Sequence, residues 1–422
     1  MKTKNVAATH SHGAKAPPDF AGEAKEPVQA EINIGMIGHV DHGKTSLVKA
    51  LTGKWTDTHS EEIKRGISIR LGYADTVFYR CKKCSSPESY SIAPKCPNCG
   101  AAAEVSRKVS FVDAPGHETL MTTMLSGATL MQGAVLVVAA NEECPQPRTE
   151  EHLMALSISG VKNIVVAQNK VDLVDKEHAK KNFVQIKNFL KNYGFENSPV
   201  IPIAANFGTN IDLLIEAIES TIKTPPHDLK KSLKMYVVRS FDVNKPGTKP
   251  EELQGGILGG SIICGELKVG DTVELSPGIN GKKLQIKVVN LSVESKKIPK
   301  AVPGGLIAIA TLLDPFVTQG DQMRGQMLAK AGTLPEPVKV LRLEIYPFKR
   351  LITGSLEGIK VNDMVVLVVG TSVAVGNVVK QVKSNIFEIA LKTPVIAETN
   401  QRIAISKRDK TSWRLAAYGI AG

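Results

Sequence analysis

The stretch Gly38-His-Val-Asp-His-Gly43-Lys44-Thr45 decides the fold of this chain. It matches the pattern Gly-x-x-x-x-Gly-Lys-[Ser/Thr], whose glycines allow a tight turn with backbone N–H groups facing phosphate oxygens. The apolar run Ile32–Ile37 precedes the stretch, and a helical pattern, Lys44–Leu51, follows it. This succession predicts a phosphate-binding loop at the start of an α/β domain. A glycine-rich turn without a ligand is the alternative, and the flanking strand and helix make it the weaker one.

Strand-like and helix-like segments alternate from residue 31 to about residue 224. The expected strands are the apolar runs Ile32–Ile37, Val109–Val112, Ala134–Ala140, Asn163–Ala167 and Val200–Ile203. The expected helices are Lys44–Leu51, His117–Leu130, Thr149–Ser159, Lys176–Asn192 and Ile211–Ile222. Such alternation predicts a mostly parallel sheet covered by helices on both faces.

The character of the sequence changes after the segment 223–231, which contains two prolines and several charges and is typical of a linker. Short β-rich runs separated by glycine and proline turns follow, and a second proline-containing break lies at 333–337. These runs predict two antiparallel β-barrels, at 232–332 and 336–422. The expected order is therefore an α/β domain at 31–224 followed by two barrel domains.

Composition restricts the partners and the cellular setting. The chain has 422 residues with a formal net charge of +12, which favours polyanionic partners. Residues 1–30 lack an apolar run, so we expect a disordered N-terminal tail rather than a secretory signal. No apolar stretch is long enough to span a bilayer, and the cysteine pattern fits a reducing compartment. We therefore expect a cytoplasmic protein that has no membrane partner.

The phosphate loop and a second motif, Asp113-Ala-Pro-Gly116-His117, predict the chemistry. Lys44 would bridge the β- and γ-phosphates, and the Thr45 hydroxyl would ligate Mg²⁺. Asp113 ends an apolar strand, where a magnesium-linked aspartate belongs, and the Gly116 N–H can bond the γ-phosphate. His117 is placed to orient an attacking water, although a structural histidine at a helix start is the alternative. The expected phosphate contacts are Asp41, His42, Gly43, Lys44, Thr45, Ser46 and Gly116, and the expected catalytic residues are His117, Asp113 and Lys44.

Asn169-Lys170-Val171-Asp172 predicts that the base is guanine. The Asp172 carboxylate can accept hydrogen bonds from guanine N1–H and its 2-amino group, whereas adenine offers no such donor pair. The stem of Lys170 can cover the plane of the base. Together with the phosphate loop, the tetrapeptide predicts a GTPase that uses GTP, GDP and Mg²⁺.

Two further segments predict metal ligands. In Arg65-Gly66-Ile67-Ser68-Ile69, the Ser68 hydroxyl can complete the Mg²⁺ shell, and an ordinary loop is the alternative. Cys81-Lys-Lys-Cys84 and Cys96-Pro-Asn-Cys99 form two Cys-x-x-Cys pairs in one short segment, residues 81–99. Four thiolates fit tetrahedral Zn²⁺ and leave no open position, so we expect a structural zinc knuckle rather than a redox pair.

In their order and spacing, these motifs resemble those of translational GTPases. The resemblance is closest to the gamma subunits of archaeal translation initiation factor 2 and covers about residues 31–422. It rests on the knuckle inserted before Asp113, the run from Lys64 to Ala74, the segments 139–142 and 145–147, and the run from Arg239 to Thr248.

The resemblance implies a heterotrimer with alpha and beta subunits that carries initiator methionyl-tRNA to the small ribosomal subunit in its GTP form and releases it after hydrolysis. It also implies that Asp41 and Gly66 help to hold a second Mg²⁺, beside Thr45 and Ser68 on the main ion. An elongation-type factor, for selenocysteyl-tRNA or for aminoacyl-tRNAs in general, is the alternative. A scaffold that binds GTP and hardly hydrolyses it remains a third possibility.

The sequence departs from the family at two places. Ser68 stands where the family has Thr, which keeps the hydroxyl and loses the stiffening methyl group. Ala204-Ala205-Asn206 stands where a Ser-Ala pair meets guanine. We expect the Ala205 N–H to serve the guanine oxygen, and the missing serine hydroxyl to weaken ordering of the loop by about 1 kcal/mol.

Overall fold

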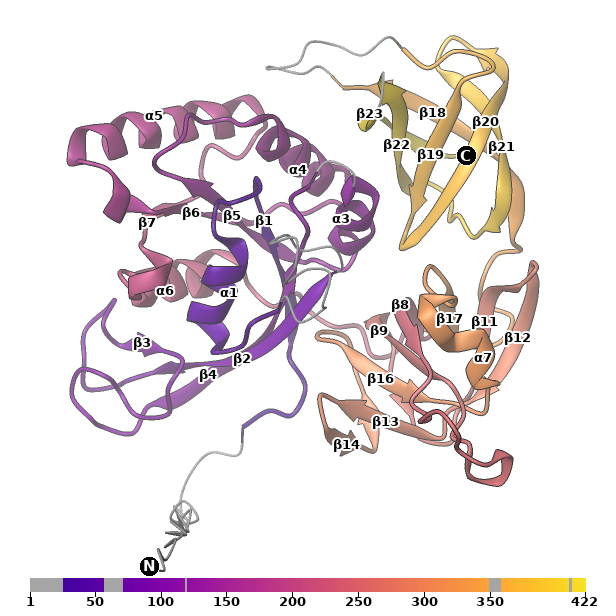
Figure 1. Cartoon of the computed structure of the whole chain (residues 1–422), viewed down its shortest axis with the longest axis horizontal. Coiled ribbons are helices and arrows are strands. Elements are labelled where there is room, and N and C mark those ends of the chain that lie inside the picture. The colour runs from indigo at the N-terminus through magenta and orange to yellow at the C-terminus, as the bar shows by residue number, and fades with distance from the viewer. Residues whose placement is uncertain (1–25, 57–70, 118–119, 349–357, 410–411) are drawn as a thin grey trace, which may run out of the picture.

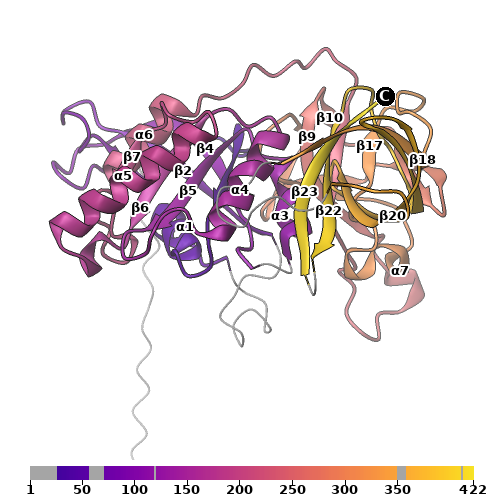
Figure 2. The same cartoon turned by 90° about the horizontal axis from the view of Figure 1, so that it is seen from above.

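The computed structural model describes residues 26–56, 71–117, 120–348, 358–409 and 412–422. Within these residues the chain forms three β-sheet domains (Figure 1), the first of them with helices on both faces. The residues between the first and second domains, 222–233, contain no helix or strand and run along one side of the molecule (Figure 2).

The first domain is built on a seven-stranded sheet in the order β3-β2-β4-β1-β5-β6-β7. Its strands are β1 (Ile32–Ile37), β2 (Gly72–Arg80), β3 (Tyr90–Ser91), β4 (Glu104–Asp113), β5 (Gly133–Ala139), β6 (Ile164–Asn169) and β7 (Val200–Pro202). Its helices are α1 (Lys44–Thr52), α3 (Met121–Ala128), α4 (Pro147–Ile158), α5 (Lys176–Asn192) and α6 (Ile211–Thr221). The neighbouring strands β4, β1, β5, β6 and β7 pair in parallel. Strand β2 pairs antiparallel with both β3 and β4. The expectation of a mostly parallel sheet is confirmed.

Alternation along the buried strands produces the two apolar faces. In β5, Leu136 faces a core shared with α3, α4 and α5, and the next residue, Val137, faces a core shared with α1 and α6. Because successive strand residues point to opposite faces, a continuous apolar run fills both cores. Among the described residues, the sheet therefore carries α3, α4 and α5 on one face and α1 and α6 on the other (Figure 1).

The second domain is an antiparallel sheet of eight strands wrapped around one core, with a short two-stranded sheet beside it. Its strands are β8 (Lys234–Phe241), β9 (Ile257–Cys264), β10 (Leu267–Lys268), β11 (Thr272–Ile279), β12 (Lys282–Lys287), β13 (Asn290–Val293), β14 (Lys296–Ile298), β15 (Lys300–Ala301), β16 (Ile307–Ala310) and β17 (Met327–Ala329), with the short helix α7 (Pro315–Thr318). The short β-rich run Leu284–Val293 of the sequence is divided between two strands, β12 and β13. The reason is that the Val289 N–H turns away to bond Ala310 of the neighbouring strand.

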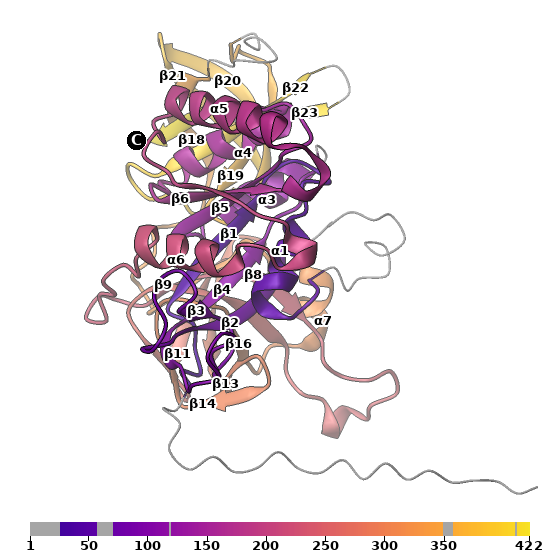
Figure 3. The ribbon, with the colours of Figure 1, turned by 90° about the vertical axis from the view of Figure 1, so that its left-hand side faces the viewer.

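The third domain is a closed antiparallel barrel in the order β18-β21-β20-β19-β22-β23. Its strands are β18 (Val338–Pro347), β19 (Met364–Val369), β20 (Ser372–Lys383), β21 (Ile386–Val395), β22 (Arg402–Asp409) and β23 (Ser412–Ala421). The barrel packs on the side of the first domain that carries α3 and α4 (Figures 1 and 3), and its Val368, Ala404 and Leu415 join the core there. This contact places the third domain next to α4, whose His152 accepts the Gly38 N–H of the phosphate loop.

Residues 26–30 belong to the predicted disordered tail, but the structure docks them between the first two domains. The Gln29 amide donates to the carbonyls of Val302 and Gly304, and its oxygen accepts the Val302 N–H. Val28 packs on the core of the second domain. The expectation of a disordered tail is therefore wrong for these five residues, because a polar side chain and an apolar one both find partners on the second domain. Residues 1–25 lie outside the described part.

Candidate nucleotide-binding site

The phosphate loop joins β1 to α1 at the carboxyl edge of the parallel strands, where ligands bind in open α/β sheets. Gly43 immediately precedes α1 in a left-handed conformation (φ 89°). A Cβ at this position would lie 2.4 Å from Asn169 Nδ2, so only glycine brings the loop this close to β6. Lys44 Nζ donates to the His39 carbonyl at 2.7 Å, which fixes the ammonium across the loop.

The Asp113 motif lies directly against the loop. A Cβ on Gly116 would be 2.7 Å from Lys44 Nζ, so the small residue allows the second motif to approach the lysine. Asp113, at the end of β4, is fully buried, and its Oδ2 accepts the Thr45 hydroxyl at 2.9 Å. A hydroxyl and a carboxylate meeting at the N-terminus of a helix are hard oxygen ligands of the kind that suits Mg²⁺.

Asn169 connects the base motif to the phosphate loop. Its Nδ2 donates to the His42 carbonyl at 2.9 Å, and its Oδ1 accepts the Ala205 N–H at 3.0 Å. The next residue, Lys170, adopts a left-handed conformation, after which Asp172 lies exposed in a short 3₁₀ turn. Ala204 and Ala205 are buried and the neighbouring Asn206 is exposed. In this structure the Ala205 N–H, expected at the guanine oxygen, is used by Asn169.

Three histidines lie in or against the loop, and burial lowers the pKa of each of them. Burial lowers the pKa of His42, while the Glu142 carboxylate 3.3 Å from its Nε2 opposes this shift; its Nδ1 donates to the Val137 carbonyl at 3.0 Å. Burial, with Lys44 and other cations nearby, places the pKa of His152 well below its ordinary value. The Gly38 N–H donates to His152 Nδ1 at 3.0 Å, which requires an unprotonated nitrogen. Burial also lowers the pKa of His39.

The remaining predicted residues of this site lie in three settings. His117 is exposed directly after Gly116, and its carbonyl accepts the Leu120 N–H at 3.0 Å. Asp41 is exposed in a left-handed conformation within the loop, while Ser46 is half-buried in α1. Ser68 and Gly66 fall outside the described residues.

The four predicted cysteine ligands converge. The Sγ atoms of Cys81, Cys84, Cys96 and Cys99 all lie within 4.8 Å of one another. The closest pairs are Cys81–Cys99 and Cys84–Cys96, each at 3.6 Å, and all four thiols are free of disulfide bonds. Four sulfur atoms at these separations form a cluster that can hold a tetrahedral metal ion.

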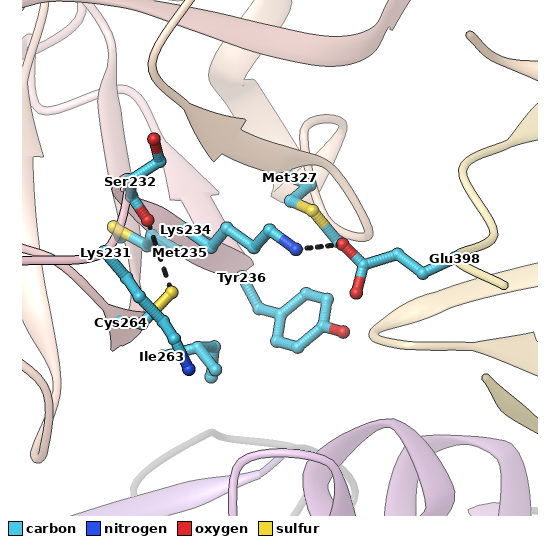
Figure 4. Close-up of a pocket in the computed structure, with 9 residues that line it drawn as sticks. All are labelled: Lys231, Ser232, Lys234, Met235, Tyr236, Ile263, Cys264, Met327 and Glu398. Carbon is cyan, nitrogen blue, oxygen red and sulfur yellow. Dashed lines mark hydrogen bonds and ion pairs between the residues drawn. The ribbon is translucent and has the colours of Figure 1, made fainter. Parts of the chain in front are cut away.

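A separate cavity of about 540 Å³ lies far from these motifs, at the junction of the second and third domains (Figure 4). An ion pair between Lys234 and Glu398 crosses it, and the Cys264 thiol donates to the Ser232 carbonyl at 3.3 Å. None of the predicted nucleotide contacts among the described residues lines this cavity. It is therefore distinct from the nucleotide site.

Sequence reasoning missed several residues that shape the site. His152 belongs to α4 and has no motif around it, so no local signal connects it to Gly38, which lies 114 residues earlier. Thr56 likewise lies outside every motif, yet its hydroxyl donates to Asp113 Oδ2 at 2.7 Å. Both contacts come from packing between distant segments, which a single sequence does not reveal.

Comparisons with known proteins agree with this geometry. Residues 29–224 match the family model for the elongation factor Tu GTP binding domain, and residues 339–421 match the model described as initiation factor eIF2 gamma, C terminal. The chain is 52% identical to translation initiation factor 2 subunit gamma of Methanococcus maripaludis over 404 residues, which cover 93% of this chain and 98% of that protein. It is also 52% identical to the Pyrococcus horikoshii subunit over 411 residues, which cover 94% and 99%.

Among solved structures, a bacterial selenocysteine-specific elongation factor matches with a TM-score of 0.71 and 26% identity, over 92% of this chain and 58% of that one. Elongation factor SelB from Methanococcus maripaludis, solved with the GTP analogue GppNHp, matches with a TM-score of 0.68 and 23% identity, over 94% and 80%. This second match concerns the fold alone.

The fold, the phosphate loop and the base motif define a translational GTPase. Such a domain implies binding of GTP, GDP and Mg²⁺. More narrowly, the chain belongs to the family of translation initiation factor 2 gamma subunits, as the identity over nearly its whole length shows. Among the described helices, none combines the length and the apolar character needed to cross a bilayer.

Proposed function

We propose that the edge of the sheet between β1, β4 and β6 holds GTP in a defined orientation. Asn169 carries this proposal, because one of its hydrogen bonds joins the base motif to the phosphate loop and the other joins it to Ala205 in the loop after β7. Guanine would lie against Asp172 and Lys170, next to Ala204, Ala205 and Asn206. The phosphates would lie along the loop, on the residues Asp41, His42, Gly43, Lys44, Thr45 and Ser46, with Gly116 at the γ-phosphate.

Hydrolysis would proceed by in-line attack of water on the γ-phosphorus. His117, exposed directly after Gly116, would orient this water. Lys44 would neutralise charge on the β- and γ-phosphates as the bond to the leaving GDP breaks. Thr45 and Asp113 would hold Mg²⁺, which supplies positive charge to the phosphate oxygens. Ser68 would complete its shell, and Asp41 with Gly66 would serve a second ion.

The cysteine cluster would bind one structural Zn²⁺. The support is geometric, since four free thiols converge on one point and occupy all four positions of a tetrahedral ion. Free thiols persist in a reducing compartment, which agrees with a cytoplasmic protein.

Membership of the family supports a proposal for the biological role. We propose that the GTP form of this chain carries initiator methionyl-tRNA to the small ribosomal subunit, in a heterotrimer with alpha and beta subunits, and that it releases the tRNA after hydrolysis. The relatives at 52% identity bear the name translation initiation factor 2 subunit gamma, and the formal charge of +12 suits an RNA partner. Sedimentation with small ribosomal subunits tests delivery. Initiator tRNA should co-sediment with the subunits when the GTP analogue is present and should not do so when GDP is present.

An elongation-type factor is the second candidate, and the fold similarity to selenocysteine-specific elongation factors favours it. The match of the third domain to the initiation factor model speaks against it. Equal binding of elongator and initiator tRNA would favour this second candidate.

The orientation of the base is tested by Asp172→Asn. The carboxylate accepts two donors from guanine, whereas an amide offers one acceptor and one donor, which fits xanthine. The variant should lose affinity for GDP by about 100-fold and bind xanthosine diphosphate more tightly than the wild type does. Unchanged GDP affinity would exclude Asp172 from the base site.

A further inference from the structure

The carboxylate of Asp113 accepts a second hydroxyl that belongs to no recognised motif. Thr56 lies four residues beyond the end of α1, and its Oγ1 donates to Asp113 Oδ2 at 2.7 Å. The Thr45 hydroxyl donates to the same oxygen at 2.9 Å. Two donors on one oxygen fix the direction in which the buried carboxylate presents its other oxygen.

Thr56 is itself held against the sheet. In the register of β2 and β4, Gly72 lies opposite Asp113. A Cβ added to Gly72 would lie 2.7 Å from the Cβ of Thr56, so the glycine leaves the space that the threonine fills. The hydroxyl reaches Asp113 because the backbone of β2 allows this close approach.

The segment that carries Thr56 is tied to the second domain. Lys54, two residues earlier, forms an ion pair with Glu294 in the turn between β13 and β14. The Glu294 carboxylate also lies 3.6 Å from Lys108 Nζ, on β4 of the first domain. A short chain of contacts therefore runs from the second domain through Lys54 and Thr56 to Asp113.

We infer that Thr56 is a positioning residue, which orients the carboxylate of Asp113 for binding of magnesium and nucleotide. Glu294 of the second domain helps to hold Thr56 in place through its ion pair with Lys54. The inference rests on the proposed role of Asp113. Without the Thr56 hydroxyl, Asp113 keeps one of its two described donors and its carboxylate is less constrained. Mg²⁺ should then bind less tightly beside the nucleotide, while contacts to the base stay unchanged.

The test is the rate of GDP release, measured with a fluorescent GDP over a range of free Mg²⁺ concentrations. In Thr56→Val, the Mg²⁺ concentration at which GDP release is slowed half-maximally should rise by about tenfold. A change of this size is what the loss of one hydrogen bond to a charged group produces. Thr56→Ser, which keeps the hydroxyl, should stay within twofold of the wild type. In EDTA all three proteins should release GDP at the same rate, since the effect acts through Mg²⁺.

Two other variants address the same point with the hydroxyl intact. Gly72→Ala displaces Thr56 and should shift the Mg²⁺ midpoint in the same direction as Thr56→Val. Glu294→Gln should shift it by about twofold, as expected of a weak exposed ion pair, and should add nothing to Thr56→Val. Thr248→Val, in a distant exposed loop, is the matched control and should leave the midpoint unchanged.

Two results would overturn the inference while the proposed function stands. One is a Mg²⁺ midpoint in Thr56→Val equal to that of the wild type. The other is GDP release from Thr56→Val that is accelerated as much in EDTA as in Mg²⁺, which would indicate a general structural role. If GDP release from the wild type did not depend on Mg²⁺, the proposed magnesium site itself would be wrong, and this inference would fall with it.

Discussion

Asn169 and His42 are joined by a hydrogen bond of 2.9 Å from the asparagine Nδ2 to the histidine carbonyl. The bond links the end of β6 to the phosphate loop, 127 residues earlier in the chain. The same side chain accepts the Ala205 N–H from the loop after β7. Three segments of the proposed nucleotide site are therefore held by one buried amide, which would couple the position of the base to that of the phosphates.

Replacing this amide should weaken nucleotide binding strongly. Asn169→Ala removes both hydrogen bonds, so the His42 carbonyl and the Ala205 N–H lose this partner. Loss of the partner costs about 1–3 kcal/mol of free energy for each buried group. We expect GDP affinity, measured by calorimetry, to fall by about 10- to 100-fold. Asn98→Ala removes one exposed hydrogen bond in the cysteine segment and should change the affinity less than twofold. A variant at position 169 that binds GDP as tightly as the wild type would contradict this account.

The buried His152 should make stability depend on pH. In the folded protein its pKa lies well below the ordinary value of 6.5, because of burial first and Lys44 second. The unfolded chain therefore binds more protons below about pH 6.5, and the free energy of unfolding should decrease as the pH falls, by up to about 1.4 kcal/mol per pH unit for this group. Urea unfolding at pH 7.5, 6.5 and 5.5 measures the effect.

His152→Gln can keep an acceptor for the Gly38 N–H and does not titrate, so its loss of stability between pH 6.5 and 5.5 should be smaller by about 1 kcal/mol. His178→Gln changes an exposed histidine on α5 and should leave the pH dependence as it is. Identical pH profiles for the wild type and His152→Gln would show that His152 is not the group responsible.

The interface between the first and third domains depends on a buried carboxylate. Glu151 on α4 is 1% exposed, and it accepts hydrogen bonds from Arg148 on its own helix and, at 3.2 Å, from Arg414 of the third domain. Arg414→Ala should lower the free energy of unfolding by about 2 kcal/mol, because the buried carboxylate of Glu151 loses one of the two cations described beside it. Arg408→Ala, exposed on the same barrel, should change it by less than about 0.5 kcal/mol. Equal effects of the two variants would contradict the assigned importance of this pair.

Zinc content tests the cysteine cluster. The wild type should contain one Zn²⁺ for each chain, and Cys99→Ser should lose most of it, since three thiolates bind the ion less tightly than four. Atomic absorption after dialysis gives the stoichiometry. Cys264 lies at the end of β9 in the second domain, so Cys264→Ser should keep the metal. Retention of zinc by Cys99→Ser would remove this residue from the ligand set.

The sequence predicted the local parts of the structure well, because each carries its own signal. The expected boundaries of β1 and α5 agree with the structure, since apolar periodicity and flanking turns mark their ends. The cysteine cluster could be predicted because spacing alone restricts four thiols to one small volume.

Features that depend on distant packing could not be predicted. Nothing in the sequence around β2 shows that it runs antiparallel beside β4, or that Gly72 lies opposite Asp113. Gln29 binds the second domain through the carbonyls of Val302 and Gly304, more than 270 residues away, and the sequence around Gln29 alone predicts a disordered tail. The same is true of Glu151 and Arg414, whose charges are common on exposed surfaces and become informative only when they are found buried together.

The most direct test of the central claim is the rate at which the aminoacyl ester of methionyl-tRNA hydrolyses in the presence of this protein and the alpha subunit. Initiator and elongator methionyl-tRNA would be compared, each with a GTP analogue and with GDP. The account predicts that initiator methionyl-tRNA alone is protected, and mainly with the GTP analogue. Equal protection of the elongator tRNA would contradict the role in initiation and would indicate an elongation-type factor.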